Sequence, residues 1–229
     1  MITKKNLEYI NKGTDIFIDK RGKIENYKLS EKINLVATIT SKPNTLRSNH
    51  YHPIQLQKCL LIKGQYISIY KNLKIKNSPR ITHVVNEGDL VTTQPLVAHT
   101  MVFIKDSIFL NLVNGEREHK NYGKTHTIPY ELVNIEEKNF LFTSYKFDCR
   151  VCGSKKLKRI ISLGFQPHAN NLSNKKNNTK TYPLELNLCT ECRNVQLSII
   201  PNFNTLFSKY FYKSSVSNSF SNHFFKAAE

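Results

Sequence analysis

Cys149-Arg-Val-Cys152 and Cys189-Thr-Glu-Cys192 are two matched Cys-x-x-Cys pairs, separated by 36 residues, and they decide the fold of the second part of the chain. Two such turns can complete a tetrahedral site of four thiolates around zinc, with Zn–S distances of about 2.3 Å. Two disulfides are the alternative, but nothing in the sequence suggests secretion. Four thiolates leave no open coordination position, so the pattern predicts a structural zinc that performs no chemistry.

The length of 229 residues suits one or two domains, and we expect the chain to be cytoplasmic. Met1 is followed by Ile-Thr-Lys-Lys-Asn with no apolar signal region, and no stretch approaches the 18 apolar residues of a membrane span. The fifth cysteine, Cys59, lies in an apolar run and is expected to be a buried thiol.

The net charge of +17 would suit a nucleic-acid partner. The basic residues are scattered, however, and the abundance of Lys, Asn and Ile together indicates a compositional bias towards A/T-rich codons. We therefore do not expect a nucleic-acid binder, and a nucleotide diphosphate would also be attracted by this charge. The clusters 155–159 and 174–178 are interpreted as solvated loops.

Residues 1–145 are predicted to form one strand-rich domain. Gly64 lies between the apolar runs 60–62 and 66–70 and predicts a tight hairpin. Further runs occupy 36–40, 81–85, 102–104 and 108–113, with a turn at 86–89. Many short strands with frequent turn signals favour an antiparallel sandwich or barrel. Helical periodicity is weak in this part, and Thr3–Asn11 is expected to be a short helix or an edge segment.

Residues 146–229 are predicted to form a second, smaller α+β module around the cysteines. Strands are expected at 182–188 and 195–200, and a polar loop at 170–181. Helical spacing of the aromatic residues after Pro201 and in the tail 219–229 predicts C-terminal helices.

Three histidines are the candidate catalytic residues of the first part. His50 and His52 lie two residues apart, so on a strand they project from the same face. His99 lies eleven residues after Gly88 and could reach the same pocket from a facing strand. The alternative is a polar patch on a barrel without activity.

These residues resemble the two motifs of the cupin superfamily. The first motif is matched by His50, His52 and Gly64, with Gln57 at the position of a Glu. The second is matched by Gly88 and His99, although Pro95 is one position late and the inner Gly is absent. The resemblance spans about 40–115 and implies a cupin jelly-roll barrel.

Two chemistries are known in such pockets. In metal cupins, three His and one Glu bind a divalent metal, and Gln57 weakens this interpretation because a neutral amide is a poorer ligand. In cupins that epimerise or isomerise sugar nucleotides, a His abstracts a proton next to a ketone. Arg47-Ser-Asn-His50-Tyr-His52 and Asp19-Lys-Arg21-Gly22 resemble elements of that branch. The resemblance implies His50 or His52 as the base, Arg47 near the diphosphate, and His99, Tyr51 and Tyr66 as partners. Gln57 is expected to contact the substrate.

The second part resembles the zinc-binding N-terminal domain of S-adenosylmethionine-dependent sugar C-methyltransferases. Beyond the cysteines, the resemblance rests on Leu163-Gly-Phe-Gln-Pro167-His-Ala-Asn170 and on Tyr210-Phe-Tyr212-Lys-Ser214. It implies that Tyr210, Tyr212 and Ser214 contact the substrate, with helix packing as the alternative for the tyrosines. The methyltransferase domain of that family would follow Glu229, so we expect a truncated chain or a partner subunit. S-adenosylmethionine would be needed only if that domain follows.

Both resemblances point to nucleoside-diphosphate sugars in deoxysugar or polysaccharide biosynthesis, and cupins often form homodimers. The leading expectation is a 4-ketosugar isomerase or epimerase joined to a substrate-binding zinc domain. The alternatives are a non-catalytic sugar-nucleotide module serving a partner methyltransferase, a zinc-dependent nucleic-acid binder, and a metal-dependent cupin dioxygenase.

Overall fold

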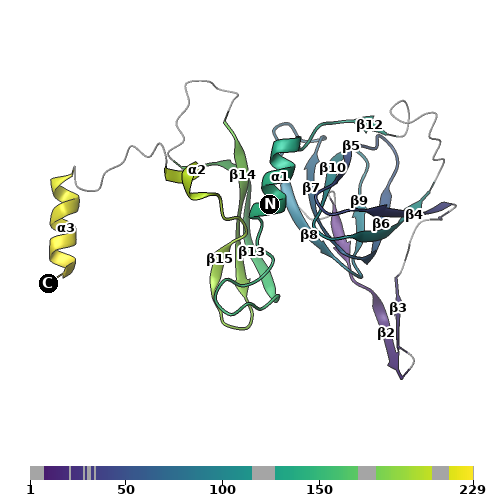
Figure 1. The fold of residues 1–229 in the computed structure, drawn as a ribbon. Coiled ribbons are helices and arrows are strands. Elements are labelled where there is room, and N and C mark those ends of the chain that lie inside the picture. The colour runs from purple at the N-terminus through teal and green to yellow at the C-terminus, as the bar shows by residue number, and fades with distance from the viewer. Residues whose placement is uncertain are drawn as a thin grey trace.

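The computed structural model describes residues 8–20, 22–27, 29, 32–33, 35–114, 127–169, 179–207 and 217–228. Its main feature is a pair of five-stranded antiparallel sheets in the N-terminal part (Figure 1). The first sheet contains, in spatial order, β1 (Tyr9–Asn11), β9 (Leu90–Thr93), β6 (Gln57–Lys63), β11 (Ser107–Val113) and β4 (Leu35–Ser41). The second contains β12 (Ile128–Pro129), β5 (Leu46–Tyr51), β10 (Val97–Phe103), β7 (Gln65–Asn72) and β8 (Ile81–Asn86).

The chain changes sheet at almost every connection from β4 to β12, which is the topology of a jelly roll. The predicted mainly β fold, with a cupin-like jelly roll, is thus confirmed. The predicted hairpin at Gly64 is wrong, because β6 and β7 belong to different sheets. Gly64 instead forms the corner between them with a φ of 105°, and an added Cβ would lie 2.2 Å from Ser107 Oγ.

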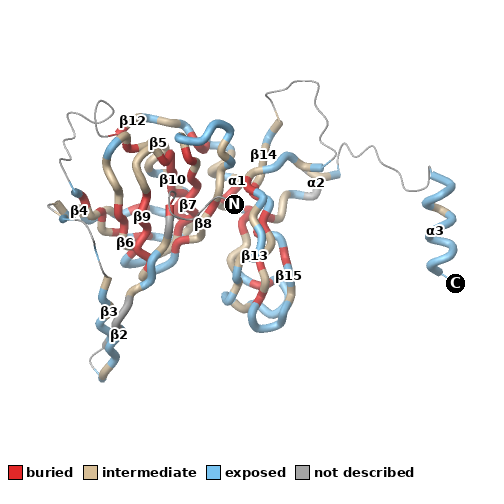
Figure 2. The backbone as a smooth tube through the Cα atoms, turned by 180° about the vertical axis from the view of Figure 1, so that it is seen from behind, coloured by how far each residue is buried: buried red, intermediate tan, exposed pale blue. Residues whose placement is uncertain are grey.

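Alternation along the strands divides the apolar residues between two cores. One core fills the interior between the sheets and includes Tyr66, Met101, Phe103 and Phe109. The other covers the outer face of the second sheet, where Ile67, Ile69, Ala98 and Val102 pack against residues from further along the chain. Figure 2 shows the buried segments concentrated in these sheets.

Helix α1 (Ile135–Ser144) covers this outer face and was not expected from the weak helical periodicity. Its start carries a capping signal, since the Asn134 side chain accepts a hydrogen bond from the Glu137 amide at 2.9 Å. Leu141 and Tyr145 pack into the same core as Ile199 from the C-terminal part. Residues from both sides of the expected boundary at 145/146 therefore share one core. The domain limits 1–145 and 146–229 stay a prediction.

A three-stranded sheet forms the C-terminal part, with β14 (Thr181–Cys189) between β13 (Leu157–Pro167) and β15 (Val195–Leu197). The interpretation of 155–159 as a solvated loop is wrong for Leu157 to Arg159, which begin β13. Helices α2 (Phe203–Phe207) and α3 (Asn218–Ala228) agree with the expected C-terminal helices. No residue of α3 is buried.

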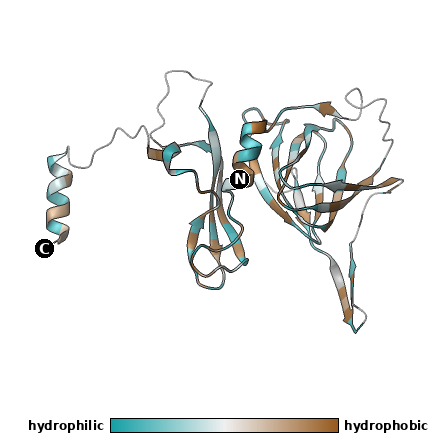
Figure 3. Ribbon diagram, viewed as in Figure 1, coloured by the Kyte–Doolittle hydropathy of each residue, from teal (hydrophilic) through white to brown (hydrophobic). Residues whose placement is uncertain are grey.

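The hairpin of β2 (Thr14–Asp19) and β3 (Gly22–Asn26) extends away from the barrel and exposes the apolar side chains Ile16, Phe17, Ile18 and Ile24 (Figure 3). The described part of Thr3–Asn11 forms edge strand β1 on β9, as one of the two alternatives for this segment predicted. Within the described ranges, no helix is long and apolar enough to span a bilayer.

Candidate functional site

His50, His52 and His99 form one buried cluster inside the jelly roll, where the sequence predicts a pocket. His50 and His99 are register partners on the neighbouring strands β5 and β10, and His52 directly follows β5. The ring centroid of His50 lies 4.8 Å from the centroid of His52 and 4.8 Å from that of His99. The centroids of His52 and His99 are 5.4 Å apart. His99 therefore reaches the pocket from a strand of the same sheet, and not from a facing one.

A bulge in β5 directs His50 into this pocket. Ser48 and Asn49 have positive φ angles of 72° and 58°, where the register of β5 against β10 shifts. The Asn49 side chain fixes the bulge: its Oδ1 accepts from the amides of Leu132 and Val133 at 2.9 and 3.1 Å. The segment preceding α1 thus holds the strand that carries His50.

The hydrogen bonds of the rings indicate their tautomers. His99 Nδ1 lies 3.1 Å from the carbonyl oxygen of Val97, so Nδ1 carries the proton and Nε2 carries the lone pair. Among the described residues, His99 Nε2 has no hydrogen-bond partner. His52 Nε2 lies 3.3 Å from Gln57 Oε1, and its Nδ1 lies 3.5 Å from Thr127 Oγ1. His99 thus offers a lone pair, whereas both nitrogens of His52 have partners.

Burial lowers the pKa of His99 to about 3, with a further contribution from His52. His99 is therefore neutral at physiological pH, as a proton acceptor or a metal ligand must be. The ligand atoms of the three histidines lie within 4.8 Å of one another, so the cluster could hold a divalent metal. Gln57 would add only an amide oxygen to such a site.

Glu8 is a buried carboxyl group that the sequence reasoning missed. It accepts hydrogen bonds from Ser68 Oγ and, at 2.9 Å, from Thr93 Oγ1, and burial raises its pKa to about 7. Thr93 is the register partner of Gln57, so Glu8 lies on the same side of the barrel interior as the histidine pocket. No motif or spacing marks Glu8 in the sequence.

The structure does not bring Arg47 into the pocket. Arg47 donates to Ser41 Oγ at 2.5 Å and to the carbonyl oxygen of Thr40 at 2.7 Å, both on β4. Tyr51 packs against the core on the outer face of the sheet, so it is not a partner of the histidines. Tyr66 packs against Phe103 deeper in the interior. Tyr210, Tyr212 and Ser214 lie outside the described residues.

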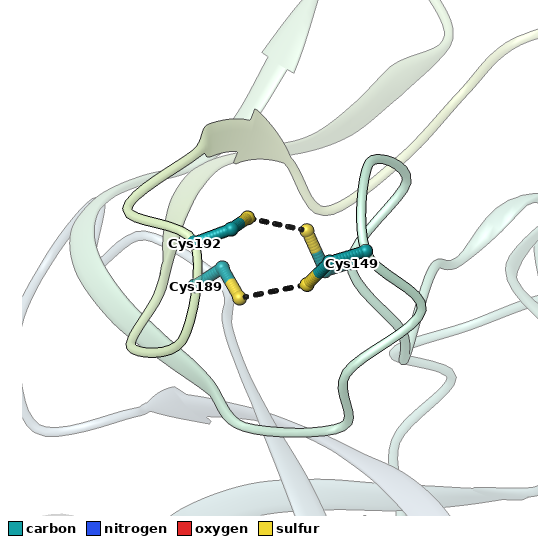
Figure 4. A group of neighbouring side chains, drawn as sticks. Cys149, Cys189 and Cys192 are labelled. Carbon is teal, nitrogen blue, oxygen red and sulfur yellow. Dashed lines mark hydrogen bonds between the residues drawn. The ribbon is translucent and has the colours of Figure 1, made fainter.

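The four cysteines form a second cluster, at the end of the C-terminal sheet (Figure 4). The sulfurs of Cys149 and Cys192 are 3.5 Å apart, and those of Cys152 and Cys189 are 3.6 Å apart. A tetrahedral zinc–thiolate site has sulfur–sulfur edges of about 3.8 Å, whereas a disulfide has an S–S bond of about 2.05 Å. The geometry fits zinc, and all four thiols are free.

Two matching turns position these sulfurs. In each turn the amide after the second cysteine bonds back to the carbonyl of the first: Gly153 to Cys149 at 2.9 Å, and Arg193 to Cys189 at 3.0 Å. Both Gly153 and Arg193 have positive φ angles, of 71° and 64°. Hydrogen bonds from the amides of Cys152 and Val151 lower the pKa of the Cys149 thiol to about 6. The first turn thus favours the thiolate form of Cys149, the form that a metal requires.

A buried carboxylate connects the C-terminal sheet to the barrel. Glu185 on β14 is 1% exposed and accepts from Arg159 Nη1 at 3.0 Å, Tyr145 Oη at 2.9 Å and Ser162 Oγ at 3.3 Å. Thr82 Oγ1 on β8 also donates to Glu185, and Arg159 Nη1 donates to the Thr82 carbonyl. These bonds hold β13 and β14 against β8.

Comparison with known proteins gives one family and a set of similar structures. Residues 149–207 match the family model Methyltransf_13, described as "Putative zinc binding domain". The sugar 3,4-ketoisomerase QdtA from Thermoanaerobacterium thermosaccharolyticum, solved with TDP, is 17% identical with a TM-score of 0.46, over 61% of this chain and 98% of its own.

Two further structures of this kind are similar. The TDP-quinovose 3,4-ketoisomerase WlaRB from Campylobacter jejuni is 17% identical with a TM-score of 0.44, over 57% of this chain and 95% of its own. The dTDP-4-dehydrorhamnose 3,5-epimerase from Sulfolobus tokodaii is 17% identical with a TM-score of 0.43, over 48% of this chain and 72% of its own. No curated protein matches significantly. The chain thus joins a cupin-like jelly roll in its N-terminal half to a C-terminal segment, residues 149–207, that matches the Methyltransf_13 model.

Proposed function

We propose that the barrel binds a nucleoside-diphosphate 4-keto-deoxysugar and catalyses proton transfer next to the ketone, as an isomerase or epimerase. The observation that carries this proposal is the convergence of three buried imidazoles in the interior, with His99 neutral and its Nε2 lone pair available. Proton abstraction next to a carbonyl requires such a neutral base in a site that excludes water. The zinc domain would add substrate contacts for a methyltransferase of deoxysugar or polysaccharide biosynthesis.

In the proposed step, His99 or His50 takes the proton from the carbon next to the ketone. The electron pair of the broken C–H bond forms a C=C bond to the carbonyl carbon, and the carbonyl oxygen becomes the negatively charged oxygen of an enolate. In epimerisation, the base keeps this proton and an acid on the opposite face of the sugar ring delivers another proton to the same carbon, which inverts it. In isomerisation, the enolate oxygen takes up a proton, and the hydroxyl on the deprotonated carbon releases its own proton as it becomes the new carbonyl. The former carbonyl carbon then receives the proton that the base holds. Because burial lowers the pKa of His99, its protonation is favoured only when a negative charge such as the enolate forms beside it.

The other site residues have proposed roles of a simpler kind. The Gln57 amide would fix the orientation of His52 through the contact between Oε1 and Nε2. Arg47, Tyr210, Tyr212 and Ser214 remain proposals for substrate binding. Arg47 would have to leave its bonds to β4 to reach a diphosphate in the pocket.

The experiment is an exchange reaction in D₂O with TDP-4-keto-6-deoxyglucose, followed by proton NMR. We expect loss of the proton signal next to the ketone, and a loss of at least a hundredfold in exchange rate for His99→Asn and His50→Asn. His223→Asn is the matched control, because His223 is exposed on α3 and lies outside the barrel. Absence of both binding and exchange with the wild-type protein would refute the proposal.

A second candidate function is non-catalytic binding of the sugar nucleotide for a partner methyltransferase. The observation in its favour is that both nitrogens of His52 are hydrogen-bonded and that Gln57 is neutral, which leaves few groups for acid–base chemistry. The same NMR experiment separates the two functions. Saturable binding that His99→Asn weakens, with no deuterium incorporation, supports this candidate and excludes the enzyme.

A further inference from the structure

A groove of about 700 Å³ lies between the barrel and the C-terminal sheet, outside the histidine pocket. The barrel contributes Lys105 and His83 to its lining, and the C-terminal part contributes Lys146, Lys155 and Arg159. Two acidic residues, Glu87 and Asp148, also line it, so the cationic side chains exceed the acidic ones. The groove is therefore a basic site to which both parts of the chain contribute.

Arg159 is the most strongly positioned of these cations. Its Nη1 is held by Glu185 and by the carbonyl oxygen of Thr82, and its side chain is 30% exposed. Both bonds use Nη1, so among the described residues Nε and Nη2 have no hydrogen-bond partner. An arginine held in this way presents its remaining donors in a fixed plane, which suits the oxygens of a phosphate group.

Among the described residues, the lysines of the groove have no counterion. No ion pair involves the side chains of Lys105, Lys146 or Lys155 within the ranges that the structure describes, whereas the adjacent Lys156 pairs with Glu191 at 2.7 Å. Lys105 and Lys155 are exposed, so their ammonium groups can move towards a ligand without breaking an existing bond. A ligand with two or more negative charges would neutralise several of them at once.

His83 adds a polar group to the lining of the groove. Its Nε2 lies 3.2 Å from the Tyr70 hydroxyl, and its Nδ1 is buried with no hydrogen-bond partner among the described residues. Burial, together with the nearby charge of Arg159, lowers the pKa of His83 to about 4. If Tyr70 donates to Nε2, then Nδ1 carries the proton, and an acceptor oxygen would satisfy it.

From these contacts we propose that the groove binds a phosphate-bearing ligand of the diphosphate class. Arg159 supplies the fixed donors, Lys146 and Lys155 supply mobile charge from one side, and Lys105 does so from the other. Phe147 also lines the groove and offers a ring against which a nucleoside base could stack. The proposal does not depend on the ketosugar chemistry of the barrel, since it concerns the diphosphate group alone.

The test is isothermal titration calorimetry of the full chain with inorganic pyrophosphate and, separately, with TDP, at fixed ionic strength. We expect saturable binding in the wild type and a Kd at least tenfold higher in Lys146→Ala/Lys155→Ala. The matched control is Lys156→Ala/Lys158→Ala, which removes the same charge from the same segment outside the groove. Similar affinities for the two probes assign the site to the free anion, and tighter binding of TDP assigns it to a nucleotide.

Two results would overturn the proposal. Equal weakening by the groove pair and the control pair would mean that the general basic charge of the chain attracts the anion. Binding that His50→Asn/His99→Asn abolishes and the groove pair leaves intact would place the ligand in the barrel. Survival of pyrophosphate binding in that histidine variant supports the groove even if the barrel proves inactive.

Discussion

Glu185→Gln is the substitution that best tests how the two parts of the chain are held together. Glu185 is almost completely buried and accepts hydrogen bonds from Thr82, Tyr145, Arg159 and Ser162. Glutamine has nearly the same shape but no charge, so packing is retained. It would leave the Arg159 guanidinium without its counterion and would place an NH₂ donor next to hydroxyl donors.

The size of the effect follows from the burial of the two partners. Removing one member of a fully buried ion pair costs about 3–5 kcal/mol. Because the Arg159 side chain is 30% exposed and keeps its bond to the Thr82 carbonyl, water compensates part of this loss. We therefore expect a loss of about 2–3 kcal/mol in the free energy of unfolding. For a chain of this size, that corresponds to a fall in melting temperature of about 4–12 °C.

The assay is urea denaturation of the zinc-loaded chain followed by circular dichroism, with thermal melting as a second readout. Glu191→Gln is the matched control: it is the same substitution in the same part of the chain, but its ion pair with Lys156 is exposed, with side chains 50% and 71% accessible. We expect it to cost no more than about 0.5 kcal/mol. If Glu185→Gln were as stable as Glu191→Gln, the buried network would not hold β13 and β14 against β8, and the reasoning would be refuted.

Three further predictions concern the metal and the buried titratable groups. Elemental analysis should find one zinc per chain, lost in Cys149→Ser but retained in Cys59→Ser; zinc retained by both variants would contradict the four-cysteine site. As the pH rises from 5 to 8, the stability of Glu8→Gln relative to the wild type should increase by about 2–3 kcal/mol, because the wild type loses the contribution of protonated Glu8 as the pH rises through its folded pKa of about 7. Urea titrations that show a constant difference between the two proteins would argue against a buried acid. When the pH falls from 7 to 4, His99→Asn should lose less stability than the wild type. In the wild type, the unfolded chain binds a proton at His99 below a pKa of about 6.5, whereas the folded protein keeps His99 neutral. Parallel curves of unfolding free energy against pH for the two proteins would exclude the lowered pKa.

The sequence predicted the features that depend on local pattern. Apolar runs bounded by turn residues located β4, β6, β7, β8 and β11, because strand formation follows alternation and turn chemistry. The cysteine spacing located the second cluster, because each Cys-x-x-Cys turn brings two sulfurs together regardless of the surrounding fold. The spacing of His50 and His52 likewise placed both rings on one face.

Long-range pairing accounts for the features that the sequence did not reveal. Arg159 lies in a run of basic residues that is typical of a solvated loop, and only its contact with the distant Glu185 makes it structural. Gly64 looks like a hairpin residue, yet the two strands it joins pair with other strands in different sheets. Glu8 has no motif, and its burial depends on Ser68 and Thr93. Helix α1 could have been located from Asn134 and Glu137, the N-cap residue and the residue whose amide donates to the cap.

Tyr70 connects the histidine pocket to the basic groove. It is the register partner of His99 on β10, and its hydroxyl lies 3.2 Å from His83, which lines the groove. Burial is the main cause of the shifted pKa values of Tyr70 and His83, and the charge of Arg159 lowers both values. A negative ligand beside Arg159 would offset that charge and would make protonation of His83 less unfavourable. The charge in the groove therefore acts electrostatically on Tyr70, the register partner of His99.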